Sequence, residues 1–152
     1  MSRASAPVVG VVVLVSLTVV LSATVLAGLA DSTPVSPPTA SLTVAADGSA
    51  DRIELAHRGG DILDVSEMDV RISVDGEELQ HQPPVPFFAA DGFESGPEGA
   101  FNNASADTFQ TGERTTLTLA STNDPQLEPG VEVSIRIAVR NSVVFDETRT
   151  AG

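Results

Sequence analysis

"RASAPVVGVVVLVSLTVVLSATVLAGLAD", residues 3–31, is the stretch that divides this 152-residue chain into two parts. Residues 8–30 form a run of 23 residues that contains no charged side chain. A helix of that length extends roughly 34 Å, which is enough to cross the hydrocarbon core of a bilayer. The nine valines and five leucines of the run favour insertion into a membrane by about 4–8 kcal/mol. The sequence therefore predicts an apolar helix over residues 5–30.

The flanking charges orient this helix. Arg3 precedes the run and Asp31 follows it, so the positive-inside rule places the N-terminus in the cytoplasm and the rest of the chain outside. A cleaved secretory signal is one alternative, because the Gly-Leu-Ala of residues 28–30 fits a small-x-small cleavage site. The apolar region of such a signal spans only about 7–15 residues, however.

An ordinary membrane anchor is the second alternative, but it leaves Pro7 and the small polar residues of the run unexplained. Proline suits the first turn of a helix, where the missing N–H costs nothing. Ser, Thr, Gly and Ala at intervals are typical of helices that pack closely against other helices. The third alternative is that the helix is retained and packs against copies of itself.

The start of the helix is similar to a known family. Residues 3–11, Arg-Ala-Ser-Ala-Pro-Val-Val-Gly-Val, resemble the N-terminus of haloarchaeal type IV pilins, in which a basic and a small residue precede a cut and a hydrophobic helix. The resemblance implies cleavage by an archaeal prepilin peptidase between Ala4 and Ser5, on the cytoplasmic side. Residues 1–4 would be the leader, and the helix would stay on the mature protein.

The same resemblance implies the partners of the chain. These are further copies or other pilins in a filament, the prepilin peptidase, the pilus assembly machinery, and the membrane before assembly. The positions expected in the filament core are Pro7, Gly10, Leu14, Ser16, Leu17, Leu21, Ser22, Ala27 and Gly28.

The charge of the outer part indicates a salt-rich setting. The chain has 21 Asp and Glu against eight basic residues, all of them Arg. Every acidic residue lies at or beyond Asp31, and from there on the formal charge is −14. Such a surface repels itself at low salt and repels nucleic acid, whereas concentrated salt screens the repulsion. The composition therefore suggests a halophile and excludes a nucleic-acid partner; the absence of Cys excludes a disulfide framework and a lipidated Cys anchor.

Residues 31–39 hold three prolines among small polar residues, which predicts a semi-rigid, extended linker. The remainder, residues 40–152, is predicted to be one all-β head, with no helix. Apolar and polar residues alternate best over residues 131–139, and turn signals recur between the expected strands. The weaker expected strands cover or begin at residues 42–44, 52–57, 69–74, 115–120 and 143–150, and the turns lie at residues 59–60, 75–76, 129–130 and 141–142.

Short strands with one polar face and frequent turns predict a two-sheet, immunoglobulin-like β-sandwich. The pilin resemblance implies the same plan of one N-terminal helix followed by a β-rich head.

Residues 83–112 form a long Pro-, Gly- and Asn-rich stretch without a clear element, and they contain five of the six phenylalanines. A structureless loop of this length is uncommon in a compact domain unless it has a role. One interpretation is that the aromatic rings cover an open end of the sandwich core. The other is a contact surface for a neighbouring subunit or an external ligand. Asn103-Ala104-Ser105 within this stretch is an acceptor sequence for N-glycosylation.

The sequence carries no pattern of catalysis. His57 and His81 lie 24 residues apart without a nucleophile motif or a phosphate-binding loop, and both are predicted to be surface histidines. A group of four acidic residues lacks the spacing of a calcium loop, so a solvated edge is expected, with a weak cation site as the alternative. The four residues are Asp61, Asp64, Glu67 and Asp69.

Two functions from different classes follow from these observations, and neither is enzymatic or needs a cofactor or metal. The first is a structural subunit of an extracellular type IV pilus-like filament at the cell surface, with adhesion as its role. The alternative is a monomeric β-sandwich binding module, anchored in the membrane or secreted, that recognises a glycan or a protein.

Overall fold

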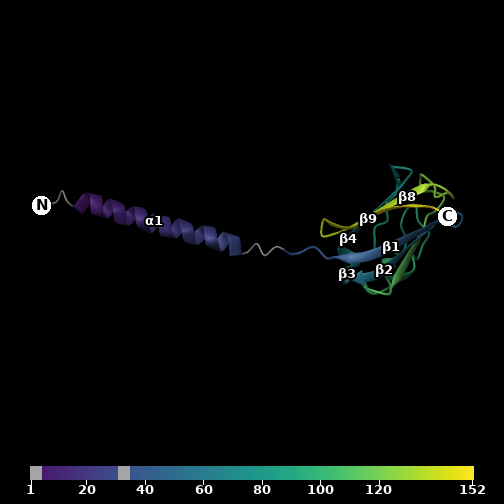
Figure 1. Ribbon diagram of the computed structural model, residues 1–152, viewed down its shortest axis with the longest axis horizontal. Coiled ribbons are helices and arrows are strands. Elements are labelled where there is room, and N and C mark those ends of the chain that lie inside the picture. Colours follow the sequence, from purple (N-terminus) through teal and green to yellow (C-terminus); the bar gives the residue numbers. More distant parts are fainter. Residues whose placement is uncertain (1–4, 31–34) are drawn as a thin grey trace. The chain divides into compact units, whose positions relative to one another are not determined.

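The computed structural model describes the backbone of residues 5–30 and 35–152 and the side chains of residues 6–25 and 35–152. One helix, α1 (Ser5–Ala30), is followed by an all-β head (Figure 1). The chain divides into two compact units between Ser36 and Pro37. The predictions of an N-terminal helix over residues 5–30 and of an all-β region after it are confirmed. The expected leader, residues 1–4, and the first half of the expected linker, residues 31–34, lie outside the described residues.

Helix α1 is built mainly from valine, which is a weaker helix former in water than alanine or leucine because its side chain is stiff. In an apolar environment, however, every backbone N–H and C=O must be bonded within the segment, and a helix achieves this. Pro7 lies in the first turn of α1, where it costs no hydrogen bond. The sequence of α1 is therefore suited to an apolar environment rather than to water.

The head contains nine strands and two short 3₁₀ helices. The strands are β1 (Ala40–Asp47), β2 (Arg52–Gly60), β3 (Leu63–Asp64), β4 (Met68–Val74), β5 (Glu77–Glu78), β6 (Thr108–Phe109), β7 (Arg114–Thr118), β8 (Glu132–Val139) and β9 (Ser142–Thr150), and the 3₁₀ helices are η1 (Val65–Glu67) and η2 (Gly99–Phe101). They form three antiparallel sheets with the orders β1-β2-β7, β3-β6 and β5-β4-β8-β9. Inward-facing residues of all three sheets contribute to a single buried core, and every residue of that core belongs to the head.

The pairing of β4 with β8 supplies the centre of this core. On both strands every second residue is buried, and the register places Val70 opposite Ile137 and Ile72 opposite Ile135. The alternation that predicted these strands is thus matched across the pair, so one face of the sheet is apolar and the other polar. Asp75 and Gly76, both at positive φ, form the tight turn that leads into β5.

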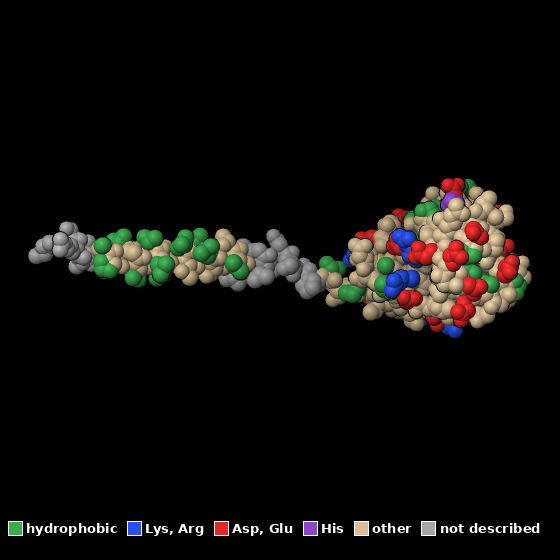
Figure 2. All heavy atoms as spheres, turned by 90° about the horizontal axis from the view of Figure 1, so that it is seen from above, with side chains coloured by type: hydrophobic (Ala, Val, Ile, Leu, Met, Phe, Trp, Pro, Cys, Tyr) green, Lys and Arg blue, Asp and Glu red, His purple; other side chains and the backbone are tan. Residues whose placement is uncertain are grey.

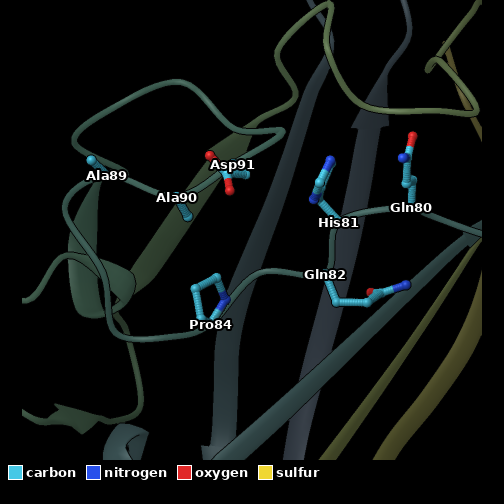
Figure 3. A pocket seen from close by; sticks show the side chains of 7 residues that line it. All are labelled: Gln80, His81, Gln82, Pro84, Ala89, Ala90 and Asp91. Carbon is cyan, nitrogen blue, oxygen red and sulfur yellow. The ribbon is translucent and has the colours of Figure 1, made fainter.

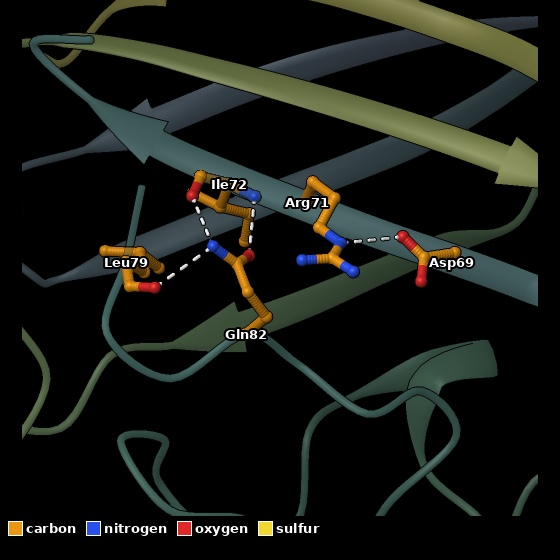
Figure 4. Close-up of polar contacts among 5 residues, drawn as sticks. All are labelled: Asp69, Arg71, Ile72, Leu79 and Gln82. Atoms are coloured by element: carbon orange, nitrogen blue, oxygen red, sulfur yellow. Dashed lines mark hydrogen bonds and ion pairs between the residues drawn. The ribbon is translucent and has the colours of Figure 1, made fainter. Parts of the chain in front are cut away.

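The outer edge of β4 is closed by a side chain as well as by backbone. The two-residue strand β5 pairs only with the end of β4, and Leu79 N–H then donates to the Ile72 carbonyl at 3.1 Å. The amide of Gln82 completes the pairing (Figure 4): its Oε1 accepts from Ile72 N–H at 2.8 Å, and its Nε2 donates to the Ile72 carbonyl at 2.9 Å. Nε2 also donates to the Leu79 carbonyl at 3.2 Å. Gln82 therefore takes the place of a strand residue at this edge.

The edge strand β9 is protected by charge. Glu147 and Arg149 lie opposite the buried Ile135 and Val133, so they extend from the core-facing side of the strand. They form a solvent-exposed ion pair at 2.6 Å at this edge. Inward-facing charges on an edge strand discourage pairing with another chain. The chain end is also fixed, because Gly152 accepts from Gly48 N–H and donates to the Ala46 carbonyl, each at 2.9 Å.

The long stretch of residues 83–112 covers the core and the edge of β7. Glu98 exchanges two backbone hydrogen bonds with Thr116, at 3.1 and 3.0 Å. Four of the five phenylalanines in residues 83–112 are buried, namely Phe87, Phe93, Phe101 and Phe109. The interpretation that the aromatic rings cover the core is confirmed for these four, whereas Phe88 is 57% exposed. The expectation of a stretch without elements is wrong in detail, since η2 and β6 lie within it.

The expected turn at residues 59–60 is also wrong. Strand β2 continues through Gly60, which pairs with Ala40 at the start of β1. Gly60 has a φ of +99°, and a Cβ at this position would lie 2.3 Å from the Thr39 carbonyl oxygen. Gly60 therefore extends the pairing by allowing β1 and β2 to approach closely, and this use of glycine cannot be told from a turn in the sequence.

We expect Gln82→Ala to lower the free energy of unfolding of the head by about 1–3 kcal/mol, because the N–H of buried Ile72 loses its partner and the carbonyls of Ile72 and Leu79 each lose a donor. Urea unfolding of residues 37–152, followed by circular dichroism in molar salt, measures this change. Gln80→Ala is the matched control, since Gln80 is exposed and its amide has no hydrogen bond within the described residues. Equal losses for the two variants would contradict the role given to Gln82.

Candidate assembly helix and head surface

Helix α1 is apolar on every face. The large side chains of residues 6–25, the part of the helix whose side chains are described, are between 56% and 65% exposed within the chain. They are Val8, Val9, Val11, Val12, Val13, Leu14, Val15, Leu17, Val19, Val20, Leu21 and Val25. Residues 6–25 are long and apolar enough to cross a membrane, and such a helix near an N-terminus can be an anchor or a signal sequence.

The described hydroxyls of α1, those of residues 6–25, are satisfied within the helix. The hydroxyls of Ser16, Thr18 and Ser22 each donate to the carbonyl four residues earlier, at 2.8 Å. Thr24 donates to the Leu21 carbonyl at 2.9 Å. This part of the helix can therefore enter lipid or a packed bundle with these four hydroxyls already paired.

The expected filament-core positions fall on this helix as follows. Gly10, Leu14, Leu17 and Leu21 are spaced by four, three and four residues, so they share one face. Pro7 lies in the first turn, while Thr18, Leu21, Ser22 and Val25 line a shallow surface groove further along. Ser5, Ala27 and Gly28 are helical, although their side chains are outside the described set. Ala4, on the other side of the expected cleavage site, lies outside the described residues.

The start of the head is fixed by Asp61. Its N–H donates to the Thr39 carbonyl at 2.8 Å, and its Oδ2 accepts from Thr39 N–H at 2.9 Å. The Asp61 carbonyl in turn lies 2.9 Å from Nε2 of His57. These contacts form a clamp, the Thr39–Asp61 clamp, that fixes the point where the linker joins β1.

The prediction that His57 is a surface residue is wrong. Its side chain is only 1% exposed, and its ring packs edge-on against Phe109 with the centroids 5.3 Å apart. Because a carbonyl only accepts, Nε2 carries the proton, and Nδ1 is buried with no hydrogen-bond partner among the described residues. The residue pattern around His57 could not reveal this, because the ring is covered by Phe109 of β6, which lies far along the chain.

The expected acidic group is dispersed among separate structural roles. Besides Asp61, Asp64 caps η1 by accepting from the hydroxyl and N–H of Ser66, and these bonds hold the pKa of Asp64 below its usual value. Glu67 pairs with Arg140 and raises the pKa of that guanidinium. Asp69 pairs with Arg71 at 3.0 Å. Within residues 5–30 and 35–152, no three His, Asp or Glu side chains are grouped to hold a metal ion.

The head has an open pocket of about 630 Å³ that the sequence did not indicate (Figure 3). Two segments line it: Gln80, His81, Gln82 and Pro84 on one side, and Ala89, Ala90 and Asp91 on the other. The only sequence signal is that residues 79–90 contain no charged residue, assuming neutral histidine.

A buried amide holds the two sides of this pocket together. Asn123, which is 2% exposed, donates from Nδ2 to the carbonyls of His81 and Gly92, at 3.0 and 3.1 Å. Its Oδ1 accepts from His81 N–H at 3.1 Å. Gly92 must be glycine here, because a Cβ would lie 2.7 Å from the Asn123 amide. The shape of the pocket is therefore set by hydrogen bonds and packing rather than by a free loop.

Acidic side chains are spread over the face of the head seen in Figure 2, with few Arg among them. Of the 20 acidic residues from residue 35 onward, five form ion pairs with Arg in the described structure. All five pairs are exposed, and such pairs stabilise a protein little. Most carboxylates of the head thus face solvent without a basic partner.

The acceptor asparagine Asn103 lies in a turn after η2 and is exposed, as are Ala104 and Ser105. Its N–H donates to the Phe87 carbonyl at 3.2 Å, which leaves the side chain amide at the surface. The position is therefore accessible to a modifying enzyme, and glycosylation of Asn103 stays a prediction.

Comparison with known proteins gives one informative match. Over 117 residues the chain is 32% identical to an uncharacterized protein of Archaeoglobus fulgidus, and the match covers 75% of this chain and 71% of the relative. The chain belongs to the family of this archaeal protein. No family model matches the chain. Because residues 1–39 make up only a small part of the chain, the 117 matched residues include a large part of the head.

We expect the melting temperature of the head to rise between low and molar KCl, because screening reduces repulsion among the unpaired carboxylates. Differential scanning calorimetry of residues 37–152 measures the shift. Sucrose at equal osmolality is the control, since it is excluded from protein surfaces without screening charge. A melting temperature that is flat in KCl, or that rises equally in sucrose, would contradict an electrostatic need for salt.

Proposed function

We propose that this protein is a structural subunit of an extracellular type IV pilus-like filament, in which α1 helices form the core and the heads face outward, with surface adhesion as the role. The observation that carries the proposal is a 26-residue helix without charge, whose large side chains over residues 6–25 are exposed on every face. The N-terminal pattern of residues 3–11 supports it, because it resembles the processing site of haloarchaeal pilins directly before the helix.

The free energy of burial explains why α1 needs partners. At about 1.5–3 kcal/mol for each buried Val or Leu, its 12 exposed large side chains represent about 18–36 kcal/mol. The head core is closed and consists only of head residues. A membrane covers α1 before assembly, and a bundle of α1 helices covers it afterwards, so each helix exchanges lipid contacts for contacts with its neighbours.

The face that carries Gly10, Leu14, Leu17 and Leu21 is the part of α1 that we assign to the closest helix–helix contacts. The spacing of four, three and four residues is that of interlocking helices, in which a large side chain inserts between residues of the facing helix. The glycine lets backbones approach at one end of this stripe. The hydroxyls of Ser16 and Ser22 are already bonded within the helix, so close packing leaves them satisfied.

For the head we propose an immunoglobulin-like β-sandwich. The two larger sheets, β1-β2-β7 and β5-β4-β8-β9, contribute their apolar faces to one core. The exposed acidic surface and the expected orientation of the helix support a location outside a halophilic archaeal cell, and the relative is itself an archaeal protein. Exposed Asn103 would then be available for glycosylation.

The second candidate is a monomeric binding module held at the membrane by α1 or secreted after its removal. The pocket between residues 80–84 and 89–91 favours it, because a filament subunit does not require such a pocket. The two candidates differ in what happens at the N-terminus, and that difference can be measured.

The mature protein purified from cell-surface material should begin at Ser5, because a prepilin-type cut precedes the helix and leaves it on the chain. Mass spectrometry of the N-terminal peptide identifies this residue. A mature chain that begins at Asp31 would show that α1 is a signal sequence and would refute the filament proposal. A chain that keeps residues 1–4 would favour the anchored module.

Leu17→Asp should abolish filaments or reduce them strongly, because a carboxylate in the middle of α1 would be buried without a partner in the bundle. Electron microscopy of cells that produce the variant as their only pilin gives the measurement. Leu17→Val is the matched control and should assemble, since it keeps an apolar side chain at the same position.

Absence of filaments in the wild type, or normal filaments of the Leu17→Asp variant, would refute the proposal. Low surface abundance of the variant would indicate failed membrane insertion instead of failed assembly. Quantifying the full-length chain in isolated membranes distinguishes the two, and the proposal requires the variant to be inserted and unassembled.

A further inference from the structure

The pocket on the head has three polar side chains with no structural task. Within the described residues, the side chains of Gln80, His81 and Asp91 form no hydrogen bond or ion pair, and Figure 3 shows them around the opening between the two lining segments. Gln82, by contrast, is already engaged at the edge of β4. The three free groups are therefore available to a ligand.

The backbone that carries these three side chains is held in place by hydrogen bonds. Both backbone groups of His81 are bonded to buried Asn123, and the same amide holds Gly92 beside Asp91. Gln80 N–H also donates to the Asp124 carbonyl at 2.7 Å. A ligand would thus meet polar groups whose backbone is already in place, which reduces the entropy lost on binding.

The chemistry of the lining selects among ligand classes. The lining contains no Arg or Lys, and the carboxylate of Asp91 disfavours anions. The lining is also poorly suited to a divalent cation, because Asp91 is its only carboxylate. An amide, an imidazole and a carboxylate together offer both donors and acceptors, which suits neutral hydroxyl groups. Pro84, Ala89 and Ala90 add apolar surface that can contact C–H groups.

We propose that this pocket binds a neutral carbohydrate, with hydroxyl groups of the sugar donating to Asp91 and exchanging hydrogen bonds with Gln80 and His81. Its volume of about 630 Å³ lies within the range of small-molecule sites, roughly 300–1,000 Å³. The pocket is open and polar, so a single sugar unit should bind with a dissociation constant of about 1 mM. Binding by the head does not depend on filament formation and applies to either function above.

Saturation-transfer difference NMR tests the proposal with the full-length chain in a phosphocholine detergent, because detergents with sugar headgroups would compete. The probes are the methyl glycosides of glucose, galactose, mannose and N-acetylglucosamine, in molar KCl. We expect at least one of them to bind. Asp91→Ala and Gln80→Ala should each weaken that binding by about five- to tenfold, the effect of one lost hydrogen bond.

Asp107→Ala is the matched control, because Asp107 is an exposed carboxylate outside the pocket lining, and it should leave binding unchanged. The methyl glycoside of glucuronic acid tests the charge argument and should bind more weakly than that of glucose. The proposal is overturned if none of the neutral glycosides binds, if binding is equal in Asp91→Ala and Asp107→Ala, or if the glucuronide binds as well as the neutral sugar. Filament formation can be intact in each of these cases, so failure here is distinguishable from failure of the filament proposal.

Discussion

An apolar helix with no charge cannot be left in water, and this constraint governs the whole chain. The side chains of α1 that would need covering are valines and leucines on all faces, so no rotation of the helix hides them. The head has the opposite requirement, because its surface is dense in carboxylates that must stay hydrated. Burying those carboxylates would cost far more than burying the helix gains. The chain therefore joins two units that need different environments, with a proline-containing segment between them.

Within the head, the sheet edges are the parts most prone to pair with another chain, and a small sandwich-like domain has many edges relative to the size of its core. Three edges are treated in three ways. A side-chain amide closes β4, a long loop covers β7, and an inward-facing ion pair protects β9. These devices matter for a protein that is proposed to assemble through its helix, since pairing between heads through open edges would compete with ordered assembly.

The sequence predicted the elements that depend on local patterns and missed those that depend on distant partners. The alternation of residues 131–139 predicts β8 because every second side chain is buried, and Asp75-Gly76 predicts its turn because both residues adopt positive φ. The strands β3 and β6 have two residues each and no periodicity to detect. The burial of His57 and the pocket fixed by Asn123 arise from contacts with segments that lie remote in the chain, and Asn123 is 42 residues from His81. Burial of four phenylalanines was the simpler of two interpretations and follows from their size.

The Thr39–Asp61 clamp has a mechanical consequence. Any tension that reaches the head through the linker arrives at Thr39, one residue before β1 begins. All eight residues of β1 pair with β2, and a pull along the strand loads those hydrogen bonds in shear, so that they bear the force together. A pull across the strand would instead break them one at a time, starting with the clamp. The clamp therefore protects the first pair of β1 and β2, Ala40 with Gly60, when the direction of the force changes.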